Sequence, residues 1–297
     1  MGGQSSSRYA DEHGALPAKG EFSCPVLDVF GTEICSLSPI FKIRQLPEAQ
    51  VCDADGRIAP GAVTILFDHA IGCSIGLAER PYRATTTLEL RVDWVGEIMP
   101  GMSIEIEARD VRFFGRTAVA DAVATQGAGG RVVALARGHF IHSTHPGGSI
   151  SEPIDWAGRE IFTEGGFDSF SSYLGVQSSG EDLLVHPRER LQGAVAVQAY
   201  HGGVIAATMD LAGRVFRSDL VSAESLLMRS LTVQYLRPSI ATMPLVVTPQ
   251  ATRVGRSAAT IEAVARCGLP GSPVTAIGLM TLLTEPLGSP SGASLPR

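Results

Sequence analysis

The stretch Pro60-Gly-Ala-Val-Thr-Ile-Leu-Phe-Asp68-His-Ala-Ile-Gly72 decides the fold, because the chain carries a second version of it. The second version reads His201-Gly-Gly-Val-Ile-Ala-Ala-Thr-Met-Asp210-Leu-Ala-Gly213, which places the two aspartates 142 residues apart. In each version a glycine, Gly61 or Gly203, precedes the aspartate by seven residues. Residues 61–77 carry almost no charge except Asp68, which predicts a helix that is apolar on all sides and therefore buried. A repeat at this spacing predicts a chain built from two similar halves.

Further pairs of similar segments follow the two helices in the same order. They are residues 88–95 and 230–236, then Gly115-Arg116 and Gly255-Arg256, and finally residues 132–136 and 274–280. The separation between partners drifts by only two residues along each half. We therefore interpret the pattern as a duplication.

Alternating apolar residues predict strands after each helix. Examples in the first half are Leu88, Leu90 and Val92, followed by Ile104 and Ile106. We expect residues 109–125 and 130–142 to form a long hairpin that turns at residues 127–130, Gly-Ala-Gly-Gly. An antiparallel sheet wrapped around the apolar helix is the simplest arrangement that would bury the helix. The sequence thus predicts an α+β fold with one such unit in each half.

The length of 297 residues suits two domains of ordinary size. We expect the first domain over residues 21–142 and the second over residues 171–285, with residues 143–170 as the linker. Residues 1–20 and 286–297 are rich in Gly, Ser and Pro, so we expect them to be disordered tails.

The composition excludes several kinds of partner. The net charge is −6 and no block of Lys or Arg occurs, so we expect no binding to nucleic acid. Every apolar stretch is broken within about 18 residues, so we expect no membrane span. The five cysteines show no C-x-x-C spacing, and the N-terminal residues lack the basic and apolar regions of a signal peptide. These features favour a reducing compartment and a cytoplasmic location.

The order of these motifs resembles that of the hotdog-fold acyl-CoA thioesterases, and most closely the phenylacetate-pathway type. The resemblance rests on His201-Gly202-Gly203, an aspartate seven residues later, the strand 230–238 and the Gly-Arg pair, and it spans residues 40–142 and 180–284. It implies a double hotdog, in which one chain supplies two hotdog units with their sheets joined side by side. It also implies hydrolysis of an acyl thioester to a free acid and a thiol.

In that family the active site lies between two hotdogs, and the resemblance places one complete site here. Asp68 and Thr87 from the first half would face His201, Gly202 and Gly203 from the second. Backbone N–H groups at a helix start can polarise a thioester carbonyl and hold oxyanion charge. A facing carboxylate can activate water as a general base or attack the carbonyl directly. The Thr87 hydroxyl would position the water or the base, and His201 would shape the loop.

The other site between the halves lacks parts of this set. Asp210 would face Ala59-Pro60-Gly61, in which the histidine is missing and Pro60 has no N–H to donate. The position matching Thr87 holds Met228, which has no hydroxyl. We therefore expect a degenerate second site around Asp210 and Gly61.

The sequence gives weaker indications of the substrate than of the catalytic residues. Arg116 and Arg256 are candidates for binding the phosphates of coenzyme A, because guanidinium groups suit phosphate. Phe67, with other apolar helix and strand residues, would line a tunnel for an apolar or aromatic acyl group. No metal or redox cofactor is needed, and coenzyme A enters only as part of the substrate. A monomer is feasible because one chain holds two hotdogs, with a homo-oligomer as the alternative.

Several other interpretations stay open at this point. Each aspartate could serve as a structural acceptor, His201 could only shape its loop, and Thr87 could be an ordinary strand residue. A hotdog hydratase or dehydratase is one alternative function, and a non-catalytic protein that binds acyl-CoA or another apolar ligand is a second.

Two motifs point to other chemistry but fit it poorly. The G-x-S-x-G pattern around Ser74 would need a strand before the serine and a helix after it, and Pro81 leaves no room for that helix. His139, His142 and His145 recur every three residues, which on a strand sends alternate side chains to opposite faces, so we expect no metal site there.

Overall fold

The structure of the protein is a computed structural model. It describes residues 24–78, 85–142, 165–194, 198–220, 226–255, 257–268 and 271–284. The expected tails, most of the expected linker, Arg256 and His145 lie outside these residues, and the domain boundaries remain predictions.

Each half contains a long helix of 19 residues that is followed by four strands. The elements of the first half are α1 (Pro25–Phe30), β1 (Glu33–Ser36), β2 (Phe41–Gln45), the 3-10 helix η2 (Ala49–Val51), α2 (Pro60–Ala78), β3 (Thr85–Trp94), β4 (Ile104–Phe114), β5 (Thr117–Gln126) and β6 (Arg131–His142). Those of the second half are α3 (Phe170–Leu174), β7 (Val176–Ser179), β8 (Asp182–Val185), the 3-10 helix η4 (Glu189–Leu191), β9 (Gln192–Ala194), β10 (Ala199–Tyr200), α4 (Gly202–Leu220), β11 (Leu226–Tyr235), β12 (Leu245–Val254), β13 (Ala258–Cys267) and β14 (Val274–Thr284). The repeat therefore starts earlier than the sequence analysis placed it, at a short helix and a hairpin in each half.

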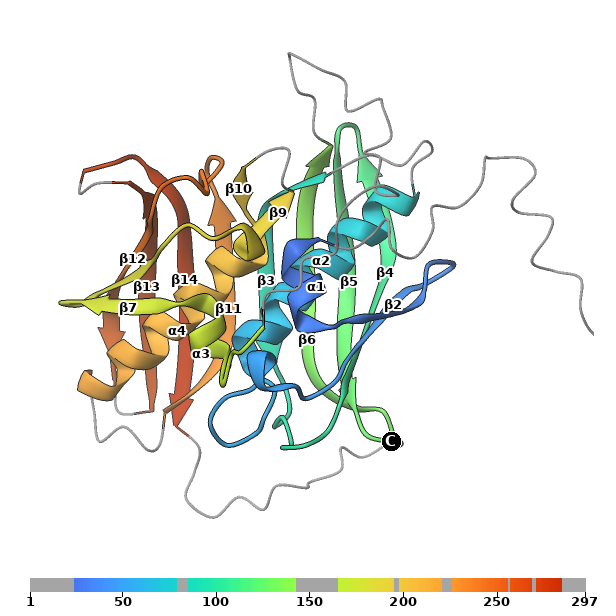
Figure 1. Ribbon diagram of the computed structural model, residues 1–297, viewed down its shortest axis with the longest axis horizontal. Coiled ribbons are helices and arrows are strands. Elements are labelled where there is room, and N and C mark those ends of the chain that lie inside the picture. The colour runs from blue at the N-terminus through green and yellow to red at the C-terminus, as the bar shows by residue number, and fades with distance from the viewer. Residues whose placement is uncertain are drawn as a thin grey trace, which may run out of the picture.

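One antiparallel sheet runs through both halves (Figure 1). Among the described residues its strand order is β1-β2-β4-β5-β6-β3-β11-β14-β13-β12-β8-β7, so β3 and β11 join the halves at the centre. Across this seam Leu90 lies opposite Val233. The sheets of the two halves are thus joined side by side, as the resemblance implied.

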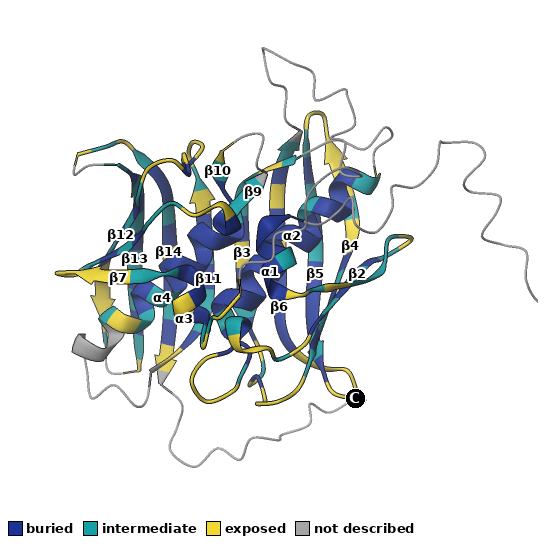
Figure 2. Ribbon diagram, viewed as in Figure 1, coloured by how far each residue is buried: buried dark blue, intermediate teal, exposed yellow. Residues whose placement is uncertain are grey.

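Both long helices lie on the same face of this sheet, and their buried residues form the core with it (Figure 2). Helix α2 is long and apolar enough to cross a membrane, but 83% of its most apolar window is buried inside the protein. This is the burial expected of a core helix, as the near absence of charge in residues 61–77 predicted. The two helices touch where α4 begins: a Cβ atom on Gly203 would lie 2.5 Å from the Ile65 Cα of α2.

The structure confirms the turn of the predicted hairpin, but the first strand of the hairpin starts later than predicted. Strands β5 and β6 turn at residues 127–130, with the Gly130 N–H donating to the Gly127 carbonyl at 3.0 Å. However, residues 109–114 belong to β4, and the chain reverses direction at Gly115-Arg116. Gly115 has a φ of 63°, a left-handed conformation that favours glycine. The Gly-Arg pair therefore marks a turn between two strands.

Candidate active site

The carboxylate of Asp68 is held by groups from both halves of the chain. The Thr87 hydroxyl of β3 donates to Asp68 Oδ1 at 2.8 Å, and the Gly203 N–H of α4 donates to Asp68 Oδ2 at 2.7 Å. His201 Nδ1 lies 3.2 Å from the same Oδ2. Asp68 is only 4% exposed. The structure thus brings together the five residues that the sequence placed in the complete site, with Gly202 as the fifth.

A β-bulge positions Thr87 for this contact. The register of β3 against β6 shifts between Thr87 and Glu89, so Leu88 is the extra residue. The register of β11 against β14 shifts in the same way between Met228 and Ser230. Bulges re-aim the neighbouring side chains. Their matching positions show that Met228 occupies in the second half the place of Thr87 in the first.

The loop before α4 is fixed by backbone hydrogen bonds. The His201 N–H donates to the Leu191 carbonyl at 2.9 Å, and the Tyr200 N–H donates to the Ser239 carbonyl at 2.9 Å. The N–H groups in the first turn of a helix have no partner inside that helix. The Gly203 N–H donates to Asp68 Oδ2 and also to His201 Nδ1 at 3.1 Å, which leaves the Gly202 N–H as the amide of this pair that does not bind the carboxylate. A Cβ atom on Gly202 would lie 2.8 Å from Asp68 Oδ2 and 2.9 Å from Thr87 Oγ1, so a side chain at this position would displace the carboxylate or the hydroxyl.

Burial sets the protonation of this site. It raises the pKa of Asp68 to about 6, while the hydrogen bonds from the Thr87 hydroxyl and the Gly203 N–H act in the opposite direction. Burial also lowers the pKa of His201 to about 4. At neutral pH the carboxyl group is therefore ionised and the imidazole is neutral. A carboxylate whose pKa lies this close to neutral pH is suited to act as a general base.

Tyr235 contacts the candidate site and was not predicted from the sequence, although it lies on the strand 230–238 that carries the resemblance. Its hydroxyl donates to the Gly202 carbonyl at 2.8 Å. Burial and the nearby Asp68 raise the pKa of Tyr235 well above its usual value. The hydroxyl is therefore protonated and remains a donor at neutral pH.

Asp210, the repeated aspartate, has different neighbours from Asp68. Asp210 Oδ2 forms an ion pair with Arg214 Nε at 2.8 Å, one helical turn away. The position of Arg214 is taken in the first half by Gly72, so Asp68 has no such neighbour on its own helix. At the other side of the site, a Cβ atom on Gly61 would lie 2.7 Å from Phe170 Cε1. The Asp210 carboxylate is thus paired with a cation, whereas the Asp68 carboxylate accepts from a hydroxyl and a backbone N–H. That the second site is degenerate remains a prediction.

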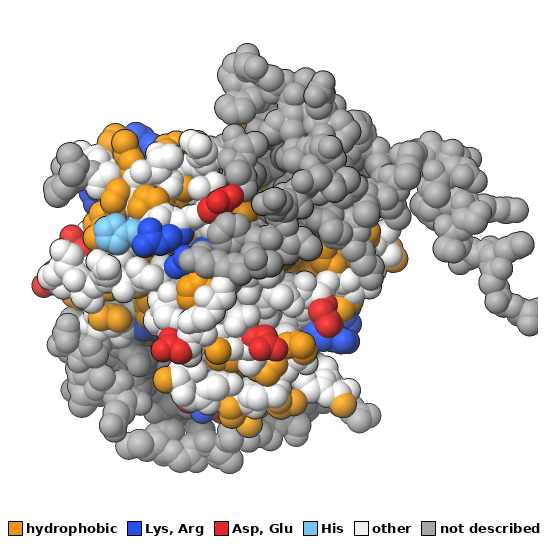
Figure 3. All heavy atoms as spheres, in the orientation of Figure 1, with side chains coloured by type: hydrophobic (Ala, Val, Ile, Leu, Met, Phe, Trp, Pro, Cys, Tyr) orange, Lys and Arg blue, Asp and Glu red, His pale blue; other side chains and the backbone are white. Residues whose placement is uncertain are grey.

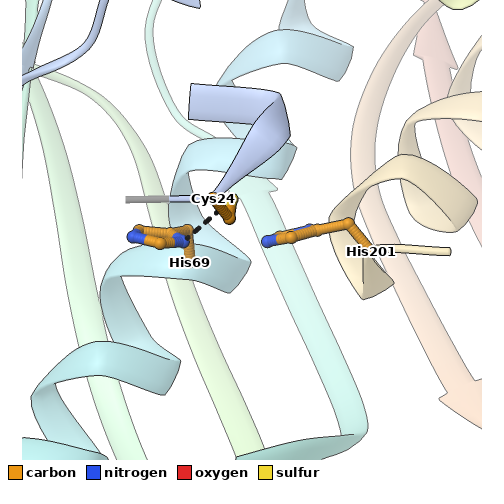
Figure 4. A group of neighbouring side chains, drawn as sticks. All are labelled: Cys24, His69 and His201. Carbon is orange, nitrogen blue, oxygen red and sulfur yellow. Dashed lines mark hydrogen bonds between the residues drawn. The ribbon is translucent and has the colours of Figure 1, made fainter. Parts of the chain in front are cut away.

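Cys24, His69 and His201 form a buried cluster (Figure 4). His201 brings this cluster beside Asp68. Sequence reasoning could not find it, because its members are far apart in the chain. One ligand atom from each lies within 4.8 Å of the others, and these are atom types that bind Zn²⁺. Within the cluster His69 Nδ1 lies 3.7 Å from Cys24 Sγ, and outside it His69 Nε2 lies 3.3 Å from Cys73 Sγ. These contacts satisfy the buried imidazole of His69 without an ion.

The predicted substrate-binding residues lie in different environments. Phe67 is fully buried in the core. Arg116 is exposed at the turn between β4 and β5. Thr87 pairs with Phe140 of β6, which pairs with Ala118 of β5. Ala118 therefore lies about 10 Å from Thr87, across two strand spacings, and Arg116 lies two residues beyond Ala118 at the turn.

The G-x-S-x-G pattern around Ser74 and the histidine at position 139 were the two motifs that pointed to other chemistry. Ser74 is buried within α2, where its hydroxyl donates to the Ile71 carbonyl at 2.8 Å, so no strand precedes it as a nucleophile elbow requires. His139 is exposed on β6.

On the molecular face seen in Figure 3, acidic and basic side chains of the described residues are interspersed with apolar ones.

Comparison with known proteins agrees with this architecture. A family model described as the thioesterase superfamily matches residues 198–272. No curated protein matches the chain. The structure of the tesB protein of Mycobacterium avium subs paratuberculosis is similar, with a TM-score of 0.58 and 10% identity over 88% of this chain and 98% of that one. The chain is a double hotdog.

Two further solved structures share the double-hotdog fold with this chain. An acyl-CoA thioesterase II from Mycobacterium marinum has a TM-score of 0.53 and 11% identity over 89% of this chain and 98% of its own. A 12:0-ACP thioesterase from Umbellularia californica has a TM-score of 0.53 and 13% identity over 85% of this chain and 100% of its own. At these identities the likeness shows the fold alone.

Proposed function

We propose that this double hotdog is a thioesterase that hydrolyses an acyl-CoA, or a related acyl thioester, to the free acid and the thiol. The observation that carries the proposal is the Asp68 carboxylate. It is buried, it has a pKa of about 6, and it lies against the start of a helix from the other half of the chain. The match to the thioesterase superfamily over residues 198–272 supports the same chemistry.

In the proposed reaction the Gly202 N–H donates to the thioester carbonyl oxygen, because Asp68 uses the Gly203 N–H. Asp68 takes a proton from water while the water oxygen bonds to the carbonyl carbon. Negative charge that develops on the carbonyl oxygen is held by the Gly202 N–H and the positive end of α4. The carbon–sulfur bond then breaks, and Asp68 returns the proton to the thiolate.

The remaining residues have supporting roles in this proposal. Thr87 holds one oxygen of Asp68 and thereby orients the other toward the helix start. His201 closes the loop beside the carboxylate as a neutral group. Arg116 would bind a phosphate of coenzyme A at the Thr87 end of the sheet, and Phe67 would support the acyl-chain side. The phenylacetate-type substrate range and a cytoplasmic location are part of the proposal.

The test is release of free thiol from short, long and aromatic acyl-CoAs and from an acyl-carrier-protein thioester. Asp68→Asn keeps the size of the side chain and removes the base, so we expect a loss of about 10²–10⁴-fold in kcat. Asp210→Asn is the matched control, because it makes the same change at the repeated position, and we expect its kcat to stay within about twofold of wild type. Equal losses in the two variants would contradict a single working site.

The same panel separates the alternative functions. Addition of water to an enoyl-CoA without thiol release would indicate a hydratase. Tight binding of acyl-CoA by folded wild-type protein, without any turnover, would indicate a binding protein.

A further inference from the structure

The peptide group between Gly202 and Gly203 is held at both ends by side chains. Its carbonyl oxygen accepts a hydrogen bond from the Tyr235 hydroxyl at 2.8 Å, and its N–H donates to Asp68 Oδ2 at 2.7 Å. A peptide group is planar, so its C=O and N–H point in opposite directions and rotate together. Fixing the carbonyl from one side therefore fixes the direction of the N–H on the other.

We propose that Tyr235 is a positioning residue for the active site, which orients the Gly202–Gly203 peptide toward Asp68. This inference rests on the proposed function and adds a residue to its machinery. Two consecutive glycines have more backbone freedom than any other pair, so the Tyr235 bond adds a constraint on the first peptide of α4. The Gly202 carbonyl has two lone pairs, so it accepts from Tyr235 in addition to any bond within α4.

The Tyr235 bond also makes the peptide a better donor. A hydrogen bond to a peptide carbonyl polarises the whole group, which strengthens the hydrogen bond that its N–H donates. The acceptor of that bond is Asp68, the proposed base. Tyr235 therefore acts through the backbone on the carboxylate, without contact with the reacting atoms.

The duplicated half provides an internal comparison. Tyr235 pairs with Ala276 of β14, and the residue that pairs with the equivalent Ala134 of β6 is Trp94. Trp94 thus occupies the place of Tyr235 in the first half. Its indole N–H is buried, with no hydrogen-bond partner among the described residues. The tyrosine hydroxyl is present in the half whose loop is complete, and it is absent where Pro60 replaces Gly202.

The positioning can be tested without any substrate. When only glycine is labelled, with ¹³C at its carbonyl and ¹⁵N at its amide, a three-dimensional HNCO spectrum shows only Gly-Gly peptide groups. The sequence contains five of these, at residues 2–3, 129–130, 147–148, 165–166 and 202–203. The Gly202→Ala variant identifies the 202–203 cross-peak by removing it.

We expect Tyr235→Phe to move the ¹³C resonance of the Gly202 carbonyl and the amide proton of Gly203 upfield, because the hydrogen bond to the carbonyl is lost and the one from the amide to Asp68 weakens. Trp94→Phe is the matched control at the repeated position, and it should leave this cross-peak in place. A 202–203 cross-peak that does not move in Tyr235→Phe would overturn the inference. This readout remains valid even if no thioester is hydrolysed, so it can fail or succeed independently of the proposed function.

Kinetics then show whether the positioning matters for the reaction. We expect Tyr235→Phe to lower kcat about tenfold, the effect of one lost hydrogen bond of ordinary strength, with KM nearly unchanged. Trp94→Phe should keep the wild-type kcat. A tyrosine with only a structural role would lower the melting temperature and leave the kcat of the folded fraction unchanged. That result, or an equal fall in both variants, would refute a positioning role.

Discussion

Replacing Asp68 by asparagine should stabilise the protein while it abolishes the proposed activity. The pKa of this carboxyl group rises from an ordinary 3.8 to about 6 because the group is buried. A pKa difference converts to free energy at about 1.4 kcal/mol per unit, so at pH 7.5 the ionised carboxylate costs the folded state about 3 kcal/mol. The asparagine that replaces it would carry no charge. Its side chain can still accept from the Gly203 N–H and donate to the Thr87 hydroxyl, which can act as donor or acceptor.

The sign of the pH dependence follows from proton binding. Between pH 4 and pH 6 the folded protein keeps the proton on Asp68 while the unfolded chain loses it, so wild-type stability falls as pH rises through this range. About 1 kcal/mol of the cost is present at pH 4.5, and about 3 kcal/mol at pH 7.5. The stability advantage of Asp68→Asn over wild type should therefore grow by about 2 kcal/mol between these two pH values.

Urea unfolding of both proteins at pH 4.5 and pH 7.5 measures this difference directly. Asp210→Asn is the control of opposite sign, because it removes the ion-pair partner of Arg214 and should lower stability. The reasoning would be refuted if the difference in unfolding free energy between Asp68→Asn and wild type were the same at pH 4.5 and pH 7.5. It would also be refuted if Asp68→Asn were less stable than wild type at pH 7.5.

Four other predictions concern the same site. In wild type, kcat/KM for thiol release should rise with pH up to a midpoint near 6, where Asp68 ionises, and then level off. Thr87→Val should move this midpoint to higher pH, because it removes a hydrogen bond that lowers the pKa of Asp68, whereas Thr87→Ser should keep it; pH–rate profiles of the two variants decide. Gly202→Ala should lose activity and keep its melting temperature, because the new Cβ meets the Asp68 carboxylate. Gly203→Ala should instead lose about 1–3 kcal/mol of stability in urea unfolding, because its Cβ meets the backbone of Ile65.

The fold could be predicted because the same pattern of a helix followed by strands occurs twice in the sequence. The long helices and the strands after them are long, periodic segments, which sequence patterns identify well. The short helices α1 and α3 were missed because they are only six and five residues long, too short for a helical period to be recognised. Each ends at a glycine with left-handed φ, Gly31 and Gly175, and this shared signal could have extended the repeat upstream.

The site was predictable only where the resemblance supplied the positions to compare. Asp68, Thr87 and the loop at His201 were matched to the motif of the family that the chain resembles, and the structure brings them into contact. Arg214 and Tyr235 were visible in the same comparison, since they stand opposite Gly72 and Trp94, but a residue pair reveals no hydrogen bond until the chain folds. The Cys24 cluster has no sequence signal, because residues from separate elements meet there only in three dimensions.

The differences between the halves explain how one chain can carry a single proposed site. Neither half holds a complete set: Asp68 and Thr87 come from the first, while His201, Gly202 and Tyr235 come from the second. The complementary residues, which would build the other site, have lost the loop amide, the strand hydroxyl and the tyrosine, and have gained Arg214 beside the carboxylate. A symmetric pair of identical hotdogs cannot diverge in this way, because each change would appear in both sites. Joining the halves in one chain removes that constraint, and it also makes each half dependent on the other for the proposed chemistry.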